Sequence, residues 1–300
     1  MSNKDDEPTS DDDLIAAVDA TEGDDMNPFV VDPAAPVVAD KPRSFADLTM
    51  RIISGAALAA MAAVFFYLGG IWTSGMLAVG GALMMWEYRS LVTRRNGFTE
   101  MGLWVMMAGA VGAAMVAQVF GLVWAMLPLG LAVAATVAAR KKHWLWMIFG
   151  IVYLGIPVAA LAHYRGDTTA GLILVFWLVA LVAATDIGGY FVGRTVGGPK
   201  LWPAISPGKT WSGTLGGWGL AAVVGLGFGL FAPGWELWPT VTLSLLLAAS
   251  SQIGDLAESW LKRRQGVKDS SRLIPGHGGI LDRLDGLVAA VNVYVLTLVF

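Results

Sequence analysis

The sequence predicts an all-α polytopic membrane protein with about nine transmembrane helices, and two observations carry this prediction. First, 56% of the 300 residues are hydrophobic, only 14% are charged, and the mean hydropathy is +0.62, whereas soluble domains have about 45–50% apolar and about 25% charged residues. Second, apolar segments of about 20 residues, long enough to cross a hydrocarbon core as a helix, recur from Ile52 to the C-terminus. A single soluble globule is therefore excluded. The absence of cysteine also excludes disulfides, thiolate metal sites and cysteine nucleophiles.

The first 43 residues differ in composition from the rest of the chain. They contain 12 Asp/Glu and three Lys/Arg, whereas residues 44–300 contain 11 Asp/Glu and 17 Lys/Arg. An acidic segment with several prolines cannot bury enough apolar surface to offset the entropy of ordering. We expect residues 1–43 to form a disordered acidic tail that is solvated; a role in interactions is the less favoured interpretation. The segment lacks the basic and apolar regions of a signal peptide.

Nine apolar segments follow the tail, and we group them into N-terminal transmembrane helices (44–180) and a C-terminal catalytic transmembrane region (181–300). Two segments are irregular, because Glu87 is expected to end the second, and Asp186 with the glycines after it to interrupt the sixth. Near an interface, Glu87 is interpreted as a helix-packing or snorkelling residue rather than a functional one. The predicted spans are residues 52–70, 71–88, 101–119, 121–139, 144–163, 169–193, 211–231, 239–261 and 281–300.

The basic residues predict the orientation of these spans, because Lys and Arg accumulate in cytoplasmic loops. With the N-terminus inside, 19 of the 20 Lys/Arg fall in cytoplasmic regions, and only Arg165 falls outside. An odd number of spans then places the C-terminal Phe300 on the periplasmic side. We therefore expect a cytoplasmic N-terminus and a periplasmic C-terminus.

Two of the cytoplasmic regions, 186–214 and 255–285, are crowded with glycine, proline and charge. Carboxylates at the ends of membrane helices, here Asp186 and Asp255, are costly and usually face a bundle interior or an aqueous cavity. On a helix, Asp255 would share one face with Ser259 and Lys262, so that a carboxylate, a hydroxyl and an ammonium line the same wall. Polar packing between helices is the alternative interpretation.

The chain after this helix also carries groups suited to anion and metal binding. The turn 275–279 contains glycines that let backbone N–H groups approach an anion closely. The last predicted helix opens with Asp282, Arg283 and Asp285, and its two carboxylates are one turn apart on one face. Carboxylates from two helices with cations nearby suit magnesium-dependent phosphoryl or nucleotidyl transfer, because hard oxygen ligands hold the ion and the cations take up developing negative charge.

Residues 259–285 resemble the signature of phosphatidate cytidylyltransferases, also called CDP-diacylglycerol synthases. The residues that carry the resemblance read S-W-L-K-R-R-Q-G-V-K-D-S-S-R-L-I-P-G-H-G-G-I-L-D-R-L-D. Upstream, G-D-L-A-E-S, D-I-G-G-Y-F-V-G-R and K-L-W-P-A-I-S-P-G-K-T-W-S-G are similar to the same family. The resemblance is close from about residue 180 onward, while residues 44–180 match only as generic membrane helices.

The resemblance implies transfer of a cytidylyl group from CTP to phosphatidic acid in the bacterial inner membrane, at an active site on the cytoplasmic side. It also implies Mg²⁺ held by Asp255 and Asp282, a monovalent cation such as K⁺, and a homodimer; no nucleic-acid partner is expected. The residues expected to take part in catalysis are Asp255, Lys262, Arg263, Lys268, Asp269, Asp282 and Asp285. Those expected to bind substrate are Asp186, Ser206, Lys209, Ser259, His277, Gly278, Gly279 and Arg283.

Several alternatives remain beside this interpretation. The stretch 206–210 is not a P-loop, because Pro203 stands where that motif needs a glycine. Lys209 is either a phosphate contact or a membrane anchor. His277 is expected to donate a hydrogen bond to phosphate rather than to bind a metal, since magnesium prefers oxygen ligands.

Two other function classes compete with the cytidylyltransferase. A polytopic transporter would also use many helices and polar groups at membrane depth, but no internal repeat relates the two halves. A CDP-alcohol phosphotransferase would use clustered aspartates and magnesium, but it needs an arginine after Asp285-Gly286 that this sequence lacks.

Overall fold

The computed structural model describes residues 45–93, 100–271, 273–274 and 278–298, and the side chains from residue 53 onward. The chain divides into two units, residues 1–35 and 36–300. All described residues belong to the second unit. The predicted acidic tail, residues 1–43, lies outside the described residues. The described residues form nine α-helices and two short strands: α2 (Phe45–Leu68), α3 (Gly70–Thr93), α4 (Met101–Phe120), α5 (Leu122–Ala139), α6 (Trp144–Arg165), α7 (Thr169–Thr195), β1 (Lys200–Trp202), β2 (Ser206–Thr210), α8 (Trp211–Phe231), α9 (Leu237–Arg264) and α10 (Leu281–Thr297).

The helices are those of a membrane protein. Six of the described helices, α4 to α9, are long and apolar enough to cross a membrane, and α2 contains a shorter apolar stretch, Ile53–Leu68. Large apolar side chains cover the outside of the second unit; Phe231 is 84% exposed and Val123 is 83% exposed. Such a surface is unfavourable in water and favourable against lipid tails. The prediction of an all-helical membrane protein is therefore confirmed, with a small two-stranded sheet added.

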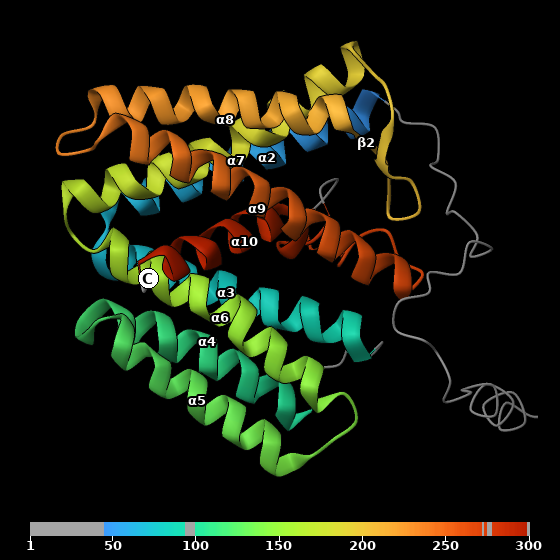
Figure 1. The fold of residues 1–300 in the computed structure, drawn as a ribbon. Helices are drawn as coiled ribbons and strands as arrows, with labels where there is room; N and C mark the ends of the chain where they lie inside the picture. Colours follow the sequence, from blue (N-terminus) through green and yellow to red (C-terminus); the bar gives the residue numbers. More distant parts are fainter. Residues whose placement is uncertain (1–44, 94–99, 272, 275–277, 299–300) are drawn as a thin grey trace, which may run out of the picture. The chain divides into compact units, whose positions relative to one another are not determined.

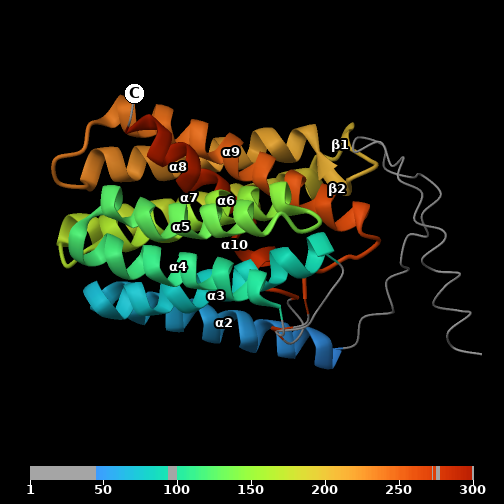
Figure 2. The same cartoon turned by 90° about the horizontal axis from the view of Figure 1, so that it is seen from below.

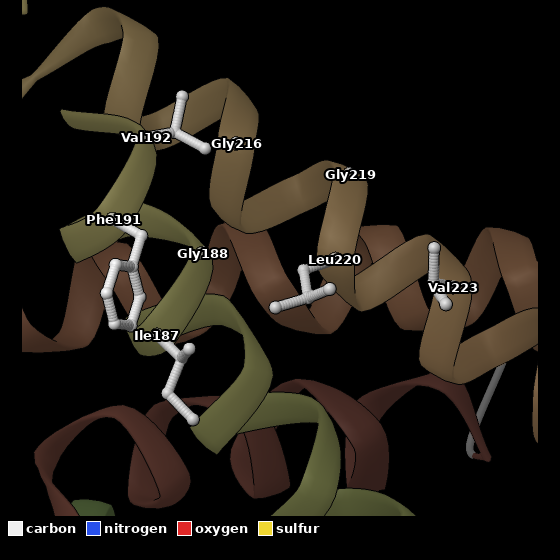
Figure 3. A pocket seen from close by; sticks show the side chains of 8 residues that line it. All are labelled: Ile187, Gly188, Phe191, Val192, Gly216, Gly219, Leu220 and Val223. Carbon is white, nitrogen blue, oxygen red and sulfur yellow. The ribbon is translucent and has the colours of Figure 1, made fainter. Parts of the chain in front are cut away.

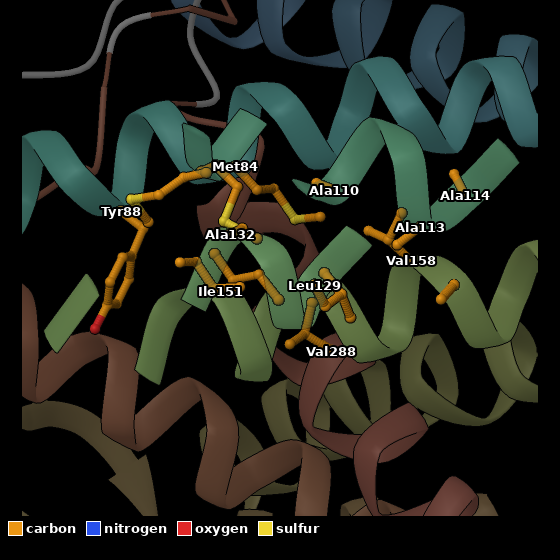
Figure 4. Packing of buried hydrophobic residues seen from close by; sticks show 14 of the residues in the cluster. Met84, Tyr88, Ala110, Ala113, Ala114, Leu129, Ala132, Ile151, Val158 and Val288 are labelled. Carbon is orange, nitrogen blue, oxygen red and sulfur yellow. The ribbon is translucent and has the colours of Figure 1, made fainter. Parts of the chain in front are cut away.

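Figures 1 and 2 show how the helices are arranged, and two clusters of buried side chains hold them together. The first joins α3, α4, α5 and α6, where small residues such as Ala110 and Ala113 let the helices approach closely (Figure 4). The second surrounds Trp177 of α7, whose indole N–H donates to the hydroxyl of Ser244 on α9 at 3.1 Å. α10 contributes Val288 to the first cluster and Val291 to the second, so it connects the two groups of helices.

The expectation that Asp186 and its glycines interrupt the sixth span is wrong, because α7 runs without a break from Thr169 to Thr195. The glycines serve helix packing instead. A Cβ on Gly188 would lie 2.7 Å from the carbonyl oxygen of Gly216 on α8, and a Cβ on Gly213 would lie 2.6 Å from that of Gly189. Only residues without side chains allow such a close approach of two helices. A shallow apolar groove follows this contact on the outer surface (Figure 3).

Two further features differ from the prediction, namely the end of α3 and the structure of region 186–214. α3 does not end at Glu87 but continues to Thr93, because the Glu87 side chain is fully buried and hydrogen-bonded rather than exposed at an interface. The region 186–214 contains the antiparallel β1–β2 hairpin, in which Lys200 pairs with Thr210. The Thr210 hydroxyl then accepts the N–H of Gly213 at 3.1 Å and caps α8 directly after the strand.

The turn between α2 and α3 is organised around Arg165, at the C-terminal end of α6. This side chain is 4% exposed. Its guanidinium donates to the carbonyls of Phe66 and Tyr67, which end α2, and to those of Gly166 and Thr168. Carbonyls at the end of a helix lack partners within the helix, so Arg165 satisfies them. Arg165 is the one basic residue that the predicted topology places outside the cytoplasmic regions, and its contacts stabilise the fold.

Candidate active site

α9 carries the first part of the site near its C-terminal end. As the spacing predicts, Asp255, Ser259 and Lys262 share a face, and the Ser259 hydroxyl lies 3.3 Å from Asp255 Oδ1. Lys262 makes ion pairs with Glu258 at 3.3 Å and with Asp282 of α10 at 2.7 Å. Its side chain is 12% exposed. Lys262 therefore links the two helices that carry the predicted carboxylates.

Asp282 of α10 accepts several hydrogen bonds through both of its carboxylate oxygens. Its Oδ1 accepts from Lys262, and its Oδ2 accepts from the N–H of Gly279 at 2.7 Å and from both the N–H and the hydroxyl of Ser270 at 2.9 Å. Because a carboxylate offers about four lone-pair sites, these donors occupy both oxygens. Asp282 lies in the first turn of α10, where the helix dipole favours a negative charge. It therefore fixes the segment before α10 to both α9 and α10.

The hairpin and α7 add further charges to the same cluster. Lys209 of β2 makes an ion pair with Asp255 at 2.6 Å, with both side chains partly exposed. Asp186 of α7 interacts electrostatically with Asp255, Lys209 and Arg283. Ser206 begins the strand that carries Lys209. The structure thus brings together charged residues from four separate parts of the sequence.

A cavity of about 960 Å³ lies between α6, α9 and α10 and reaches the tip of Tyr88 on α3. Its wall is largely apolar and aromatic, with Trp146, Phe149 and Trp260 among the lining residues. The carboxylates of Glu258 and Asp285 lie on the same wall and adjacent to each other. The charged cluster and the apolar cavity are therefore contiguous.

Other predicted site residues lie at the edge of this cluster. Arg263 donates to the carbonyl of Val267 at 3.4 Å, while Lys268 and Asp269 are exposed. The N–H of Gly278 donates to the carbonyl of Ile274 at 3.2 Å, and that of Gly279 to Asp282, so both amides have acceptors within the protein. The predicted His277 lies outside the described residues. Substrate contacts by these residues stay predictions.

Glu87 is a site residue that the sequence analysis missed, because it was interpreted as a packing or snorkelling residue. Its carboxylate accepts hydrogen bonds from Ser271, Ile280 and Leu281, all within the signature region 259–285. It is 0% exposed, so it does not snorkel. The available signal was a carboxylate within the predicted membrane span 71–88, because an ionisable residue inside a span marks a functional position by default.

The residues of the cluster fit a magnesium ion by their chemistry. Among the described residues, no three His, Cys, Asp or Glu side chains converge on one point. This does not exclude magnesium, which is usually held by one or two carboxylates together with water and substrate phosphates rather than by a complete protein cage. Asp255 has the simpler environment, with one ion pair and one hydroxyl contact. Asp282 would have to release at least one donor before it could hold an ion.

The fold and the site define a helical membrane protein with a charged cluster beside an apolar cavity, an arrangement suited to phosphoryl chemistry on an amphipathic molecule. Residues 49–300 match the sequence model of the cytidylyltransferase family, and the chain belongs to this family.

Curated relatives agree with this assignment. The proteins of Brucella suis biovar 1 and Brucella melitensis biotype 1 are each 40% identical to this chain over 258 residues, covering 83% of this chain and 93% of the relative. A Haemophilus influenzae protein is 46% identical over 142 residues, covering 46% of this chain and 49% of the relative. All three are named phosphatidate cytidylyltransferase.

Proposed function

We propose that this protein is a phosphatidate cytidylyltransferase, which transfers the cytidylyl group of CTP to phosphatidic acid and makes CDP-diacylglycerol and pyrophosphate. The observation that carries the proposal is the contiguity of the site, because Glu258 and Asp285 belong both to the charged cluster and to the apolar cavity. A reaction between a water-soluble triphosphate and a lipid phosphate needs these two environments side by side. The names of relatives that are 40% identical support the same activity.

The chemistry needs little from the protein beyond positioning and charge neutralisation. A phosphate oxygen of phosphatidic acid, ionised near neutral pH, attacks the α-phosphorus of CTP. A phosphorus–oxygen bond forms to the lipid phosphate, and the bond between the α-phosphorus and the bridging oxygen breaks, so that pyrophosphate leaves with the electron pair. Since the nucleophile is already ionised, no general base is required, and catalysis reduces to in-line placement and stabilisation of the developing negative charge.

The cations of the cluster have separate roles in this proposal. Lys262 is held between Glu258 and Asp282, so it maintains the spacing of α9 and α10 around the reacting groups. Lys209 and Arg283 are more exposed, and they bind phosphate oxygens of the substrates. Lys209 is then a phosphate contact that exchanges its partner Asp255 for substrate. Arg263 and Lys268 add positive charge at the edge of the site.

Magnesium is part of the proposal, with Asp255 and Asp282 as its protein ligands. Held by these two carboxylates, the ion would supply positive charge that offsets the negative charge of the substrate phosphates. Asp255 lies beside Lys209, so the carboxylate is balanced before an ion arrives. A monovalent cation and a homodimer, both implied by the family resemblance, complete the proposed enzyme. Their tests are activity in potassium-free buffer and the mass of the purified protein in lipid nanodiscs.

The proposed topology has nine spans, with the N-terminus and the active site on the cytoplasmic side of the inner membrane and the C-terminus in the periplasm. The support for it is the distribution of Lys and Arg in the sequence. Because the chain has no cysteine, single cysteines can be introduced without a background. We expect an impermeant thiol reagent to label Asp167→Cys, but not Val267→Cys, in intact spheroplasts. The opposite pattern would overturn the orientation.

The activity itself is tested with purified protein, CTP, phosphatidic acid and magnesium. We expect release of one pyrophosphate for each CDP-diacylglycerol formed. A transporter would give no pyrophosphate under these conditions. A CDP-alcohol phosphotransferase would instead consume CDP-diacylglycerol in the presence of an alcohol and release CMP.

A further inference from the structure

Glu87 is a buried acidic residue of α3, a helix that also buries Arg89, which makes an ion pair with Glu100. It lies on α3, 183 residues before Ser270 in sequence, and its side chain is 0% exposed. Burying a carboxylate is costly unless donors replace the lost water. The position of those donors therefore indicates what the residue holds in place.

Three donors to Glu87, and one further hydroxyl beside it, come from the segment that leads into α10. The N–H of Ile280 donates to Oε1 at 3.0 Å, and the N–H of Leu281 donates to Oε2 at 2.7 Å. The hydroxyl of Ser271 donates to Oε1 at 2.6 Å, and that of Ser270 lies 3.4 Å from Oε2. Ile280 and Leu281 open α10, whose first N–H groups have no acceptor within the helix. A carboxylate from α3 thus caps α10 in the way that a local side chain usually does.

The contact is linked directly to Asp282. The hydroxyl of Ser270 lies between the two carboxylates, 2.9 Å from Asp282 Oδ2 and 3.4 Å from Glu87 Oε2. Gly279 makes this approach feasible, because a Cβ at that position would lie 2.6 Å from Glu87 Oε1 and would collide with the Ser270 hydroxyl. The N–H of Gly279 donates to Asp282 and that of the next residue, Ile280, donates to Glu87. Displacing Glu87 would therefore displace the donors that orient Asp282.

We propose that Glu87 is a positioning residue of the transfer reaction, which clamps residues 270–271 and 279–281 to α3 and so holds Asp282 in its catalytic orientation. The proposal rests on the proposed function, because it assigns Asp282 a role in that reaction. It gives α3, which contributes none of the predicted catalytic groups, a direct part in the active site. Glu87 itself does not contact the substrates.

The clamp is tested by hydrogen–deuterium exchange on Glu87→Gln in lipid nanodiscs. A glutamine keeps the shape of the side chain but replaces one acceptor oxygen with an amino group that repels the N–H donors. We expect the amides of Ile280 and Leu281 to exchange at least about tenfold faster than in the wild type, because local opening becomes easier. Ser90→Ala is the matched control, because Ser90 is also buried near this end of α3, but its hydroxyl donates to Trp86 on the same helix. It should leave exchange at α10 unchanged.

The catalytic consequence is measured as kcat per folded molecule, with CTP and phosphatidic acid varied separately. We expect Glu87→Gln to lower kcat about 100-fold, because small displacements of a catalytic group have effects of this size. The KM for CTP should change by less than about threefold, since Glu87 makes no substrate contact. Faster exchange with an unchanged kcat would reduce Glu87 to a structural role, and unchanged exchange would remove the clamp; either result overturns the proposal.

A milder variant covers the case in which Glu87→Gln does not fold. Ser271→Ala removes one of the three donors and leaves the carboxylate in place, so it should accelerate exchange at Ile280 and lower kcat in the same direction by a smaller factor. The exchange experiment does not depend on the activity. If the wild-type protein released no pyrophosphate, the proposed function would fail while the clamp could still be measured.

Discussion

A buried charged side chain lies near each end of α3, Glu87 at one end and Arg165 at the other. Each one hydrogen-bonds unpaired backbone groups at the end of a neighbouring helix. Near one end, the carboxylate of Glu87 accepts the first N–H groups of α10. At the other end, the guanidinium of Arg165 donates to the last carbonyls of α2. Glu87 is 17 residues from Gly70, the first residue of α3, which corresponds to about 25 Å along the helix. An anion at a helix N-terminus and a cation at a C-terminus are both favoured by the helix dipole.

The difference lies in what each charge holds. The segment bound by Glu87 also binds Asp282, which pairs with Lys262, so the clamp is connected to the charged cluster. The groups bound by Arg165 are backbone carbonyls of the last turn of α2 and of the residues that follow α6. A buried charge in a membrane helix therefore does not by itself indicate catalysis. The groups at the far end of its hydrogen bonds decide the role.

The largest expected effect comes from an Asp→Asn substitution, which should impair catalysis at the Glu87 end of α3 but not at the Arg165 end. Asp282→Asn should lower kcat/KM by about 10³ or more, about 4 kcal/mol, because it removes a charge that orients Lys262 and is proposed to hold magnesium. Asp255→Asn should act similarly, and Asp285→Asn less. Asp167→Asn, an exposed aspartate beside Gly70 at the opposite end, should leave kcat/KM unchanged. The measurement is turnover per folded molecule across a magnesium titration, and near-wild-type turnover of Asp282→Asn would refute the site.

Arg165→Met should have the next largest effect, on stability instead of turnover. The substitution removes the donor of the Phe66 and Tyr67 carbonyls, whereas the Thr168 carbonyl still accepts the N–H of Leu172. Each buried unsatisfied group costs about 1–3 kcal/mol, so we expect unfolding to become easier by about 3 kcal/mol in total. The check is thermal unfolding in nanodiscs together with kcat of the folded fraction. A large loss of kcat at unchanged stability would break the comparison.

A pair of glycines offers a third and smaller contrast. A Cβ on Gly171 would collide with the backbone carbonyls of Tyr164 and Arg165, whereas one on Gly279 would meet side-chain atoms of Ser270 and Glu87. Gly171→Ala should therefore destabilise the protein by about 2 kcal/mol, since overpacking against backbone is not easily relieved. Gly279→Ala should instead lower kcat with less change in Tm. Parallel melting and turnover measurements of the two variants would show whether the effects separate in this way.

The smallest expected effect comes from Lys209→Met. The ion pair of Lys209 with Asp255 is partly exposed, and exposed pairs contribute little to stability, so Tm should stay within about 2 °C of the wild type. Loss of a phosphate contact should lower kcat/KM about tenfold, or about 1.4 kcal/mol. Lys142→Met, on the α5–α6 connection, is the control. Equal activity of the two variants would show that Lys209 is only a membrane anchor.

Most of the helical architecture could be predicted from sequence, because apolar length and basic residues report on local burial and charge. Each predicted segment coincides with one described helix to within a few residues, apart from the extended ends of α2, α3 and α9. The predicted break in α7 was wrong because glycine has two opposite effects on helices. It weakens an isolated helix, but between two helices it permits close packing, and only the partner α8 decides which applies.

Residue spacing alone predicted the site only where its residues lie close in sequence, and the grouping of Asp186 and Lys209 with Asp255 came from the family resemblance. The helical spacing of Asp255, Ser259 and Lys262 is sufficient to place them on one face. The contact of Lys209 with Asp255 and that of Glu87 with Leu281 join segments far apart in the chain. Such contacts depend on the packing of entire helices, and no local pattern records them.

Because α9 is one continuous helix, its length restricts which sequence changes the protein can accept. It is 28 residues long, about 42 Å, and exceeds the hydrocarbon core of about 30 Å. Leu246 lines the apolar cavity, and Glu258, 12 residues later, belongs to the charged cluster, so this one helix sets a distance of about 18 Å between the two residues. Inserting one residue between them would turn the cluster by about 100° away from the cavity. The stretch can thus accept many changes of side chain but no change of length.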